Sequence, residues 1–198
     1  MKKINLFLAV MFISLLGFSQ GLSIGDVAPD FRLKNVDGKY VSMADYPDAK
    51  GFVVIFSCNH CPFVVAYEDR MIEIHNKYAP KGFPVIAINP NDTIAQPQDS
   101  FSNMIVRAAE KGFPFPYLID ARQEVYPKYG ATRTPEVFLL ERSGGQLKLA
   151  YTGTLDDNHR DAGAVKEKYL AKAIDALLAG KKPEPTVTRA IGCTIKTR

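Results

Sequence analysis

Residues 51–63 read GFVVIFSCNHCPF, a short apolar run followed by two cysteines that are separated by two residues. The unbroken apolar part predicts a strand buried on both faces of a mostly parallel sheet. Residues 62–78 follow with apolar positions at helical spacing, and Pro62 is tolerated in the first turn of a helix. Cys58 and Cys61 are therefore expected where a buried strand gives way to a helix.

The rest of the chain alternates strands and helices, which is typical of an α/β fold. Buried strands are predicted at 83–89 and 116–120, helices at 100–112 and 161–180, and an antiparallel hairpin at 134–153. An earlier hairpin is predicted to turn at Asp37 and Gly38. We expect residues 21–180 to form one domain and residues 181–198 to form a C-terminal tail.

The N-terminus has the pattern of a secretory signal peptide. Lys2 and Lys3 precede an apolar stretch that is short for a membrane span, and small residues follow near a plausible cleavage point at Ser19 or Gln20. Residues 1–20 are therefore predicted to be a cleaved leader, and the protein to be exported to the periplasm or another extracytoplasmic space, without a stable membrane span. The net charge of +4 falls to +2 without these two lysines, so no nucleic-acid partner is predicted.

The spacing of the two cysteines indicates redox chemistry. The N-terminus of a helix presents free N–H groups and the positive end of the helix dipole, which stabilise a thiolate. Cys58 is expected there as the nucleophile, and Cys61, about one turn later, is placed to resolve a mixed disulfide. His60 is expected to lower the pKa of Cys58 further. Such a dithiol needs no cofactor, so none is predicted.

The cysteine pair has two simpler alternative roles, a structural zinc site and a structural disulfide. A structural zinc site usually needs two pairs of ligands, and the chain has a single CxxC, so no metal is predicted. A purely structural disulfide across the CxxC would close a very short loop and would add little stability. An active dithiol is the role that the spacing favours.

Three stretches of the chain resemble the redoxin branch of the thioredoxin-like superfamily, which includes peroxiredoxins and exported thiol–disulfide oxidoreductases. They are GDVAPDFRLKNVDGKYVSM (25–43), VVIFSCNHCPF (53–63) and TRTPEVFLL (132–140). Three others, CNHCPFVVAYEDR (58–70), GTLDDN (153–158) and GCTIK (192–196), look like a peroxiredoxin-like subgroup of redoxins. The resemblance covers roughly residues 24–180. It implies a thioredoxin-like fold, with a central mixed sheet flanked by helices, an N-terminal hairpin extension and a C-terminal tail.

The resemblance also implies how substrates bind. A cis peptide bond is expected before Pro135, packed against the cysteine pair, where it would expose the backbone of Thr134 for strand-like pairing with a substrate chain. An ordinary trans proline at the start of a strand is the alternative. The implied partners are proteins that carry a disulfide or a dithiol, together with a redox partner that resets the active site.

The chain departs from thioredoxins in two respects. Ser57 stands where thioredoxins place a tryptophan before the first cysteine, and the chain contains no tryptophan. The predicted strand before the pair also lacks the buried acid of thioredoxins. Proton transfer is therefore expected to involve another group, with Glu68, His60 and water as candidates.

A peroxiredoxin-like thiol peroxidase, with an antioxidant role, is one alternative function. Peroxiredoxins place a proline and a threonine or serine seven and three residues before the peroxidatic cysteine. If Cys61 had that role, Val54 and Cys58 would occupy those positions, so the hydroxyl that orients peroxide is missing. Arg133, just before the Thr–Pro pair, could supply positive charge.

A copper-binding redoxin-type chaperone is a further alternative. Two soft thiolates and an imidazole would suit copper, and His159 is the candidate third ligand. Chaperones of this kind typically space their cysteines by three residues, whereas the spacing here is two.

Cys193 in the tail is a candidate third redox cysteine. Three cysteines leave one without a partner inside a CxxC disulfide, so Cys193 could remain a free thiol or form a disulfide with Cys58 or with a partner. The sequence as a whole predicts an exported thiol–disulfide oxidoreductase. In this account Cys58 attacks, Cys61 resolves, His60 tunes the thiolate, and Thr134 and Pro135 hold the substrate.

Overall fold

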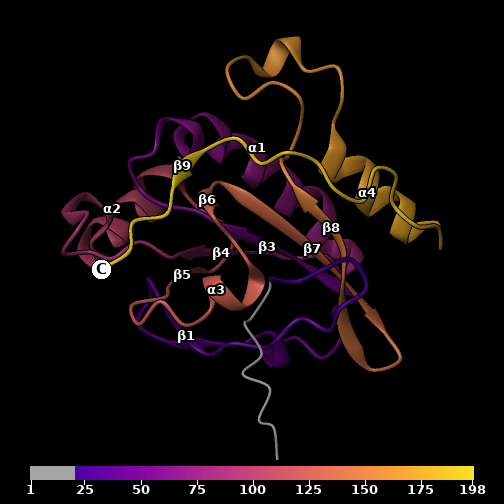
Figure 1. The fold of residues 1–198 in the computed structure, drawn as a ribbon, viewed down its shortest axis with the longest axis horizontal. Coiled ribbons are helices and arrows are strands. Elements are labelled where there is room, and N and C mark those ends of the chain that lie inside the picture. The colour runs from indigo at the N-terminus through magenta and orange to yellow at the C-terminus, as the bar shows by residue number, and fades with distance from the viewer. Residues whose placement is uncertain (1–20) are drawn as a thin grey trace, which may run out of the picture.

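The computed structural model describes residues 21–198 (Figure 1). The expected leader, residues 1–20, lies outside the described residues. The strands are β1 (Leu33–Asn35), β2 (Tyr40–Val41), β3 (Gly51–Phe56), β4 (Val85–Asn89), β5 (Tyr117–Ile119), β6 (Arg133–Thr134), β7 (Glu136–Ser143), β8 (Gln146–Gly153) and β9 (Cys193–Thr194). The helices are α1 (Pro62–Tyr78), α2 (Phe101–Lys111), α3 (Tyr126–Tyr129) and α4 (Tyr169–Leu178), with short 3-10 turns η1 (Met43–Asp45), η2 (Ala79–Lys81), η3 (Pro97–Asp99) and η4 (Ala162–Ala164).

Seven strands form one mixed sheet in the order β2-β1-β5-β4-β3-β7-β8. β3, β4 and β5 run parallel, as their apolar sequences predict, and β7 and β8 extend the sheet as an antiparallel hairpin. At the other edge, β1 and β2 form the N-terminal hairpin, whose turn contains Gly38 with a φ of 86°. The predicted fold class, a central mixed sheet flanked by helices, is confirmed.

Strand β3 lies at the centre of two apolar cores. On one face, Val53 and Ile55 pack with side chains of α1, α2 and α4. On the other face, Phe52, Val54 and Phe56 pack with α3, the segment before β1 and the connection after β2. Full burial of side chains of this size stabilises the fold by about 1.5–3 kcal/mol each. β3 is therefore a rigid base for the cysteine loop that follows it.

The last helix is shorter than the sequence predicts. An α-helix was expected over 161–180, but α4 begins at Tyr169, and the preceding residues form the single turn η4 and an extended stretch. The Asp161 side chain accepts a hydrogen bond from the backbone N–H of Gly163 at 2.8 Å. This contact caps the start of η4. Beyond η4, the backbone N–H of Lys166 donates to the Asp157 carboxylate at 3.0 Å, and such side-chain bonds compete with helical hydrogen bonding.

The C-terminal tail runs back over the domain from α4 to β9, as the yellow part of the ribbon shows in Figure 1. Thr188 donates its backbone N–H to Thr152 of β8 at 2.9 Å, and β9 pairs with β6 to form a separate two-stranded sheet. Ile195 then enters the core on the α3 side of the large sheet. Within residues 21–198, no helix is both long and apolar enough to cross a membrane.

Candidate redox site

The cysteine pair lies in the loop that joins β3 to α1, at the end of the central strand. Cys61 is the N-cap residue of α1, and Cys58 stands three residues earlier in the loop. The prediction that Cys58 occupies the helix N-terminus is therefore wrong, because Cys61 holds that position. Both residues are buried, with exposed fractions of 2% for Cys58 and 0% for Cys61.

A disulfide joins Cys61 to Cys193 of β9, which lies 132 residues further along the chain. The two Cα atoms are 6.2 Å apart, and Cys58 is a free thiol. Cys193 was expected either to remain a free thiol or to form a disulfide with Cys58 or with a partner protein, and in this structure it pairs with Cys61 instead. Cys58, Cys61 and the partly buried Cys193 nevertheless belong to one apolar cluster. All three cysteines are therefore gathered at one site.

Thr134 and Pro135 lie against the two cysteines of the pair. The peptide bond between them is cis, as the family resemblance implies. The Thr134 hydroxyl oxygen is 3.4 Å from the sulfur of Cys58, and the Thr134 carbonyl oxygen is 3.3 Å from the sulfur of Cys61. The backbone of Thr134 was expected to be free for a substrate strand. Here it pairs with Cys193 of the tail, and Thr134 is fully buried.

The buried acid that is missing from β3 comes from a different part of the chain. Asp99, in the turn η3, is fully buried. Its carboxylate accepts hydrogen bonds from the backbone N–H of Asn59 at 2.8 Å and from the Asn91 amide at 2.6 Å, and it pairs with Nδ1 of His60 at 3.0 Å. Asp99 therefore braces the cysteine loop and places a carboxylate within 4.8 Å of the Cys58 thiol.

Glu68, a sequence candidate for proton transfer, belongs to another cluster. Its carboxylate accepts a hydrogen bond from Nε of Arg107 at 2.7 Å and lies 3.7 Å from the ammonium of Lys111. This ion-paired group joins α1 to α2. The contacts favour Asp99 and His60 over Glu68 as the ionisable neighbours of the cysteines.

The pKa of Cys58 is raised from its ordinary value of 9.0 to about 11. Burial is the main cause, and the negative charge of Asp99 adds to it. The Thr134 hydroxyl and the backbone N–H groups of Cys61 and His60 act in the opposite direction, because they stabilise a thiolate. The prediction of a lowered pKa is therefore wrong for this closed form, and the side chain of His60 is turned to Asp99.

The copper-ligand set proposed from the sequence is not assembled. The ring of His159 packs on Phe63, with the ring centres 4.7 Å apart. Within residues 21–198, the potential metal ligands that cluster are Cys58, His60 and Asp99, whose ligand atoms all lie within 4.8 Å of one another. His159 is outside this group, and the disulfide removes the thiolate of Cys61.

Arg133 does not supply the charge that a peroxidase site would need. Arg133 is exposed, and its Nη1 donates a hydrogen bond to the carbonyl oxygen of Gly192 at 3.1 Å. The guanidinium therefore holds the tail against β6.

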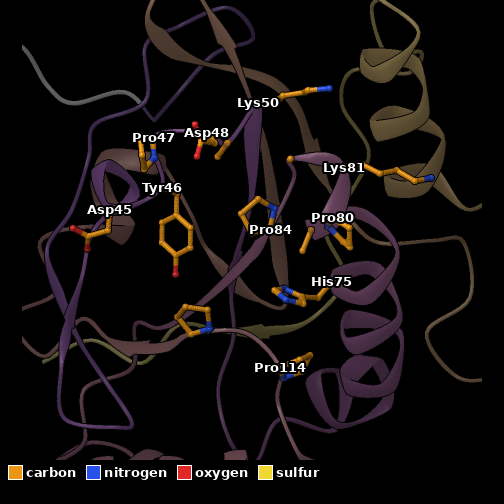
Figure 2. A pocket seen from close by; sticks show the side chains of 14 residues that line it. Asp45, Tyr46, Pro47, Asp48, Lys50, His75, Pro80, Lys81, Pro84 and Pro114 are labelled. Atoms are coloured by element: carbon orange, nitrogen blue, oxygen red, sulfur yellow. The ribbon is translucent and has the colours of Figure 1, made fainter.

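A separate hollow of about 700 Å³ opens near the beginning of β3, at the opposite end of this strand from the cysteines. Figure 2 shows Tyr46, His75 and Pro84 around it. Burial lowers the pKa of His75, whose Nδ1 accepts a hydrogen bond from the backbone N–H of Val85. No cysteine lines this hollow, so it is distinct from the redox site.

Comparison with known families identifies the fold. Residues 24–149 match the family described as AhpC/TSA, which is more than half of the chain. The chain belongs to the AhpC/TSA family. This membership confirms the redoxin resemblance that the sequence motifs indicate, and the matched residues run from before β1 into β8 and do not include the C-terminal tail.

Individual relatives of this AhpC/TSA protein include named oxidoreductases. The thiol-disulfide oxidoreductase ResA of Geobacillus thermodenitrificans is 28% identical over 136 residues, which are 68% of this chain and 72% of that protein. The crystal structure of an uncharacterized conserved protein from Geobacillus kaustophilus is 40% identical with a TM-score of 0.82, covering 89% of this chain and 93% of that one. The crystal structure of a protein described as a thiol:disulfide interchange protein, DsbE, from Chlorobium tepidum is 26% identical with a TM-score of 0.56, covering 67% of this chain and 85% of that one.

The cysteines and the Thr–Pro pair that the sequence motifs singled out lie together in the structure, whereas Asp99 was missed. Its only signal is that residues 90–99 follow β4, which ends at the same edge of the sheet as β3. In open α/β sheets, functional groups gather beyond the carboxyl ends of parallel strands.

Proposed function

We propose that the protein is an exported thiol–disulfide oxidoreductase that exchanges electrons through Cys58 and Cys61. Its AhpC/TSA membership and its similarity to ResA and DsbE support this class of reaction. The observation that carries the proposal is the convergence of Cys58 and Cys61 on Thr134, next to a disulfide that already involves one of them.

The proposed reaction starts from a reduced protein in which β9 has left β6. Water then reaches Cys58, so burial, the main cause of its raised pKa, weakens. The N–H groups of His60 and Cys61 and the Thr134 hydroxyl remain in place to stabilise the thiolate. Cys58 attacks one sulfur of a client disulfide and releases the other sulfur as a thiolate.

Cys61 completes the exchange. Its thiolate attacks the sulfur of Cys58 in the mixed disulfide, so the Cys58–Cys61 bond forms and the client leaves as its second thiolate. The client has gained two electrons and the protein has lost two. Thr134 and Pro135 hold the extended client chain during this step, and the pair of His60 and Asp99 is the nearest ionisable group for proton transfer.

The proposal of export depends on the leader pattern in residues 1–20 and on the chemistry of the site. Disulfides persist mainly in oxidising compartments outside the cytoplasm. If the protein is exported and processed, its mature form in a periplasmic fraction will begin near residue 20 or 21, which N-terminal sequencing can establish. A cytoplasmic product that keeps Met1 would contradict export.

Peroxide reduction has less support from the geometry. If Cys61 were the peroxidatic cysteine, the hydroxyl that orients peroxide would be missing, because Cys58 stands three residues before it where peroxiredoxins place a threonine or serine. Arg133 binds the tail. Dithiol exchange is therefore the function that these residues favour.

The proposed function is tested with the reduced full chain and a small-peptide disulfide. Cys58→Ser is expected to abolish exchange, and Cys61→Ser to accumulate the mixed disulfide, since the attacking thiol remains but the resolving thiol is lost. His159→Ala serves as the control and is expected to react like the wild type. Exchange by Cys58→Ser at the wild-type rate would show that another cysteine is the nucleophile.

A further inference from the structure

A short strap of the tail, residues 189–194, covers the redox site. It is held at both ends. Before it, Thr188 bonds to Thr152 of β8 through its backbone, and its hydroxyl lies 2.6 Å from that of Tyr151. After it, Ile195 is 6% exposed in the core, and its N–H donates to the Thr132 carbonyl at 3.1 Å.

The strap itself is loosely packed compared with its two ends. None of residues 189–194 is buried. Its attachments are the pairing of β9 with β6, the hydrogen bond from Arg133 to Gly192 and the disulfide of Cys193. Segments with few buried contacts open locally at low cost. Once the disulfide is broken, the strap can lift while Thr188 and Ile195 keep it tethered.

The docked strap occupies the position that a client chain needs. β9 pairs antiparallel with β6, with Cys193 opposite Thr134 and Thr194 opposite Arg133. This pairing places a cysteine of an extended chain beside the Thr134 backbone and within bonding distance of Cys61. A client strand and the strap therefore exclude each other.

Gly192 makes this close docking possible. A Cβ atom added there would lie 2.6 Å from the carbonyl carbon of Thr134 and 3.1 Å from the nitrogen of Pro135, and closer still to the Thr134 oxygen. These are backbone atoms, which cannot turn aside as a flexible side chain would. A glycine immediately before the cysteine is thus required for the observed register.

We propose that Cys193 is a third catalytic cysteine, which takes the disulfide over from Cys58 after the client has left; this rests on the proposed function. The strap docks on β6, and the Cys193 thiolate attacks the sulfur of Cys61 in the Cys58–Cys61 disulfide. The Cys61–Cys193 bond forms as the Cys58–Cys61 bond breaks, and Cys58 leaves as a thiolate that accepts one proton. No electrons enter or leave the protein in this step.

The closed site favours the products of this transfer. With the strap docked, Cys58 is only 2% exposed, and burial beside Asp99 keeps it protonated at neutral pH. The hydrogen-bonded His60 and Asp99 lie within 4.8 Å of its sulfur to assist the protonation. The disulfide is thereby moved to a pair that includes the partly buried Cys193, while Cys61 stays fully buried.

This arrangement identifies where the resetting partner acts. A dithiol reductant is expected to attack the sulfur of Cys193, the more accessible of the two, and to release Cys61 as a thiolate. Reduction frees the strap and opens β6 to the next client. The tail thus separates the client reaction from the resetting reaction in time.

Disulfide mapping tests the transfer directly. Cleavage by trypsin after Lys50 and Arg70 leaves Cys58 and Cys61 in one peptide, 51–70, and cleavage after Arg189 and Lys196 leaves Cys193 in peptide 190–196. A Cys58–Cys61 bond stays within the first peptide, whereas the transferred bond links the two peptides. Fragmentation between His60 and Cys61 distinguishes Cys61–Cys193 from Cys58–Cys193. The reduced full chain is mixed with one equivalent of a small-peptide disulfide and quenched with acid at intervals.

In the wild type, the internal Cys58–Cys61 bond is expected first and the Cys61–Cys193 link afterwards. Gly192→Ala is expected to slow the second step by about tenfold or more, because such overpacking typically costs 1–3 kcal/mol. Gly163→Ala is the matched control, since a Cβ there meets only the Asp161 side chain, at 3.2 Å. Cys193→Ser is expected to stop at the internal bond.

The outcomes separate this inference from the proposed function. The transfer to Cys193 is wrong, and the exchange function stands, if the Cys58–Cys61 bond forms in all variants but the Cys61–Cys193 bond never follows in the wild type. The same conclusion holds if Gly192→Ala forms the Cys61–Cys193 bond as fast as Gly163→Ala does. If a Cys61–Cys193 link forms without a preceding Cys58–Cys61 bond, the bridge is structural and the transfer is also wrong. If no variant reacts with the peptide disulfide, the proposed function itself fails.

Discussion

Replacing Asp99 by asparagine is expected to lower the pKa of Cys58 markedly. The sulfur of Cys58 and the carboxylate of Asp99 lie within 4.8 Å of each other. At an effective dielectric constant of about 20, two charges at this distance repel each other by about 3.5 kcal/mol. A repulsion of this size would raise the pKa of Cys58 by about 2.5. Screening by polar neighbours reduces the effect, so we expect a fall of roughly 1 to 2 from the value near 11.

The measurement is the rate at which iodoacetamide alkylates Cys58, as a function of pH, in protein whose Cys61–Cys193 bond is formed. At pH 8 the Asp99→Asn variant should react about 10 to 100 times faster, since the thiolate is the reactive form. Asp120→Asn is the control: Asp120 is also buried, but it caps the backbone of α3 through Val125 and is not among the causes of the Cys58 shift. An unchanged or higher pKa in Asp99→Asn would refute the electrostatic argument.

Three further predictions concern the same site. Below pH 9 the Cys58 thiol is protonated in both the folded and the unfolded states. Between pH 9 and 11 only the unfolded state loses the proton, which favours unfolding. The free energy of unfolding of the wild type should therefore fall by up to about 2–3 kcal/mol relative to that of Cys58→Ser. Denaturant unfolding of both proteins from pH 9 to 11 measures this difference. If the free energies of unfolding of the two proteins change with pH in the same way, the prediction is wrong. Thr134→Val removes a hydrogen bond that stabilises the Cys58 thiolate, so alkylation of Cys58 should be slower at every pH below its pKa; a faster reaction would mean that the variant exposes Cys58. Ile195→Ala should destabilise the fold by about 2–5 kcal/mol in denaturant unfolding, because it empties a buried site that anchors the tail, and a loss below 0.5 kcal/mol would mean that the anchor contributes little.

The central sheet and the cysteine loop could be predicted because their signals are local. The apolar run of β3, the cysteine spacing and the start of α1 at Pro62 lie within a few residues of one another. The position of Thr134 and Pro135 beside the cysteines came from the family resemblance, because residues so distant in sequence carry no pattern of contact. The described structure places them there.

The chemistry of Cys58 could not be predicted from the same local pattern. Helix dipoles and neighbouring N–H groups suggested a low pKa, but the pKa of Cys58 depends mainly on its burial in the folded chain. Asp99 lies in a turn that is 41 residues further along the chain, and its negative charge raises the pKa of Cys58. The Cys61–Cys193 disulfide spans 132 residues, and its pairing follows from the register of β9 on β6.

The length of α4 was also predicted incorrectly, for a different reason. The composition of residues 161–168 suits a helix, yet the backbone N–H of Lys166 donates to the side chain of Asp157 instead of to a helical carbonyl. Such competition between side-chain and helical hydrogen bonds depends on geometry that a periodic pattern does not contain.

The most direct test of dithiol exchange compares two oxidants on the reduced full chain. One equivalent of a small-peptide disulfide or one equivalent of hydrogen peroxide is added, and the loss of free thiols is followed in the wild type and in Cys58→Ser. We predict that the peptide disulfide oxidises the wild type much faster than peroxide does, and that Cys58→Ser loses this reaction. Faster oxidation by peroxide would contradict the account and would make the protein a peroxidase.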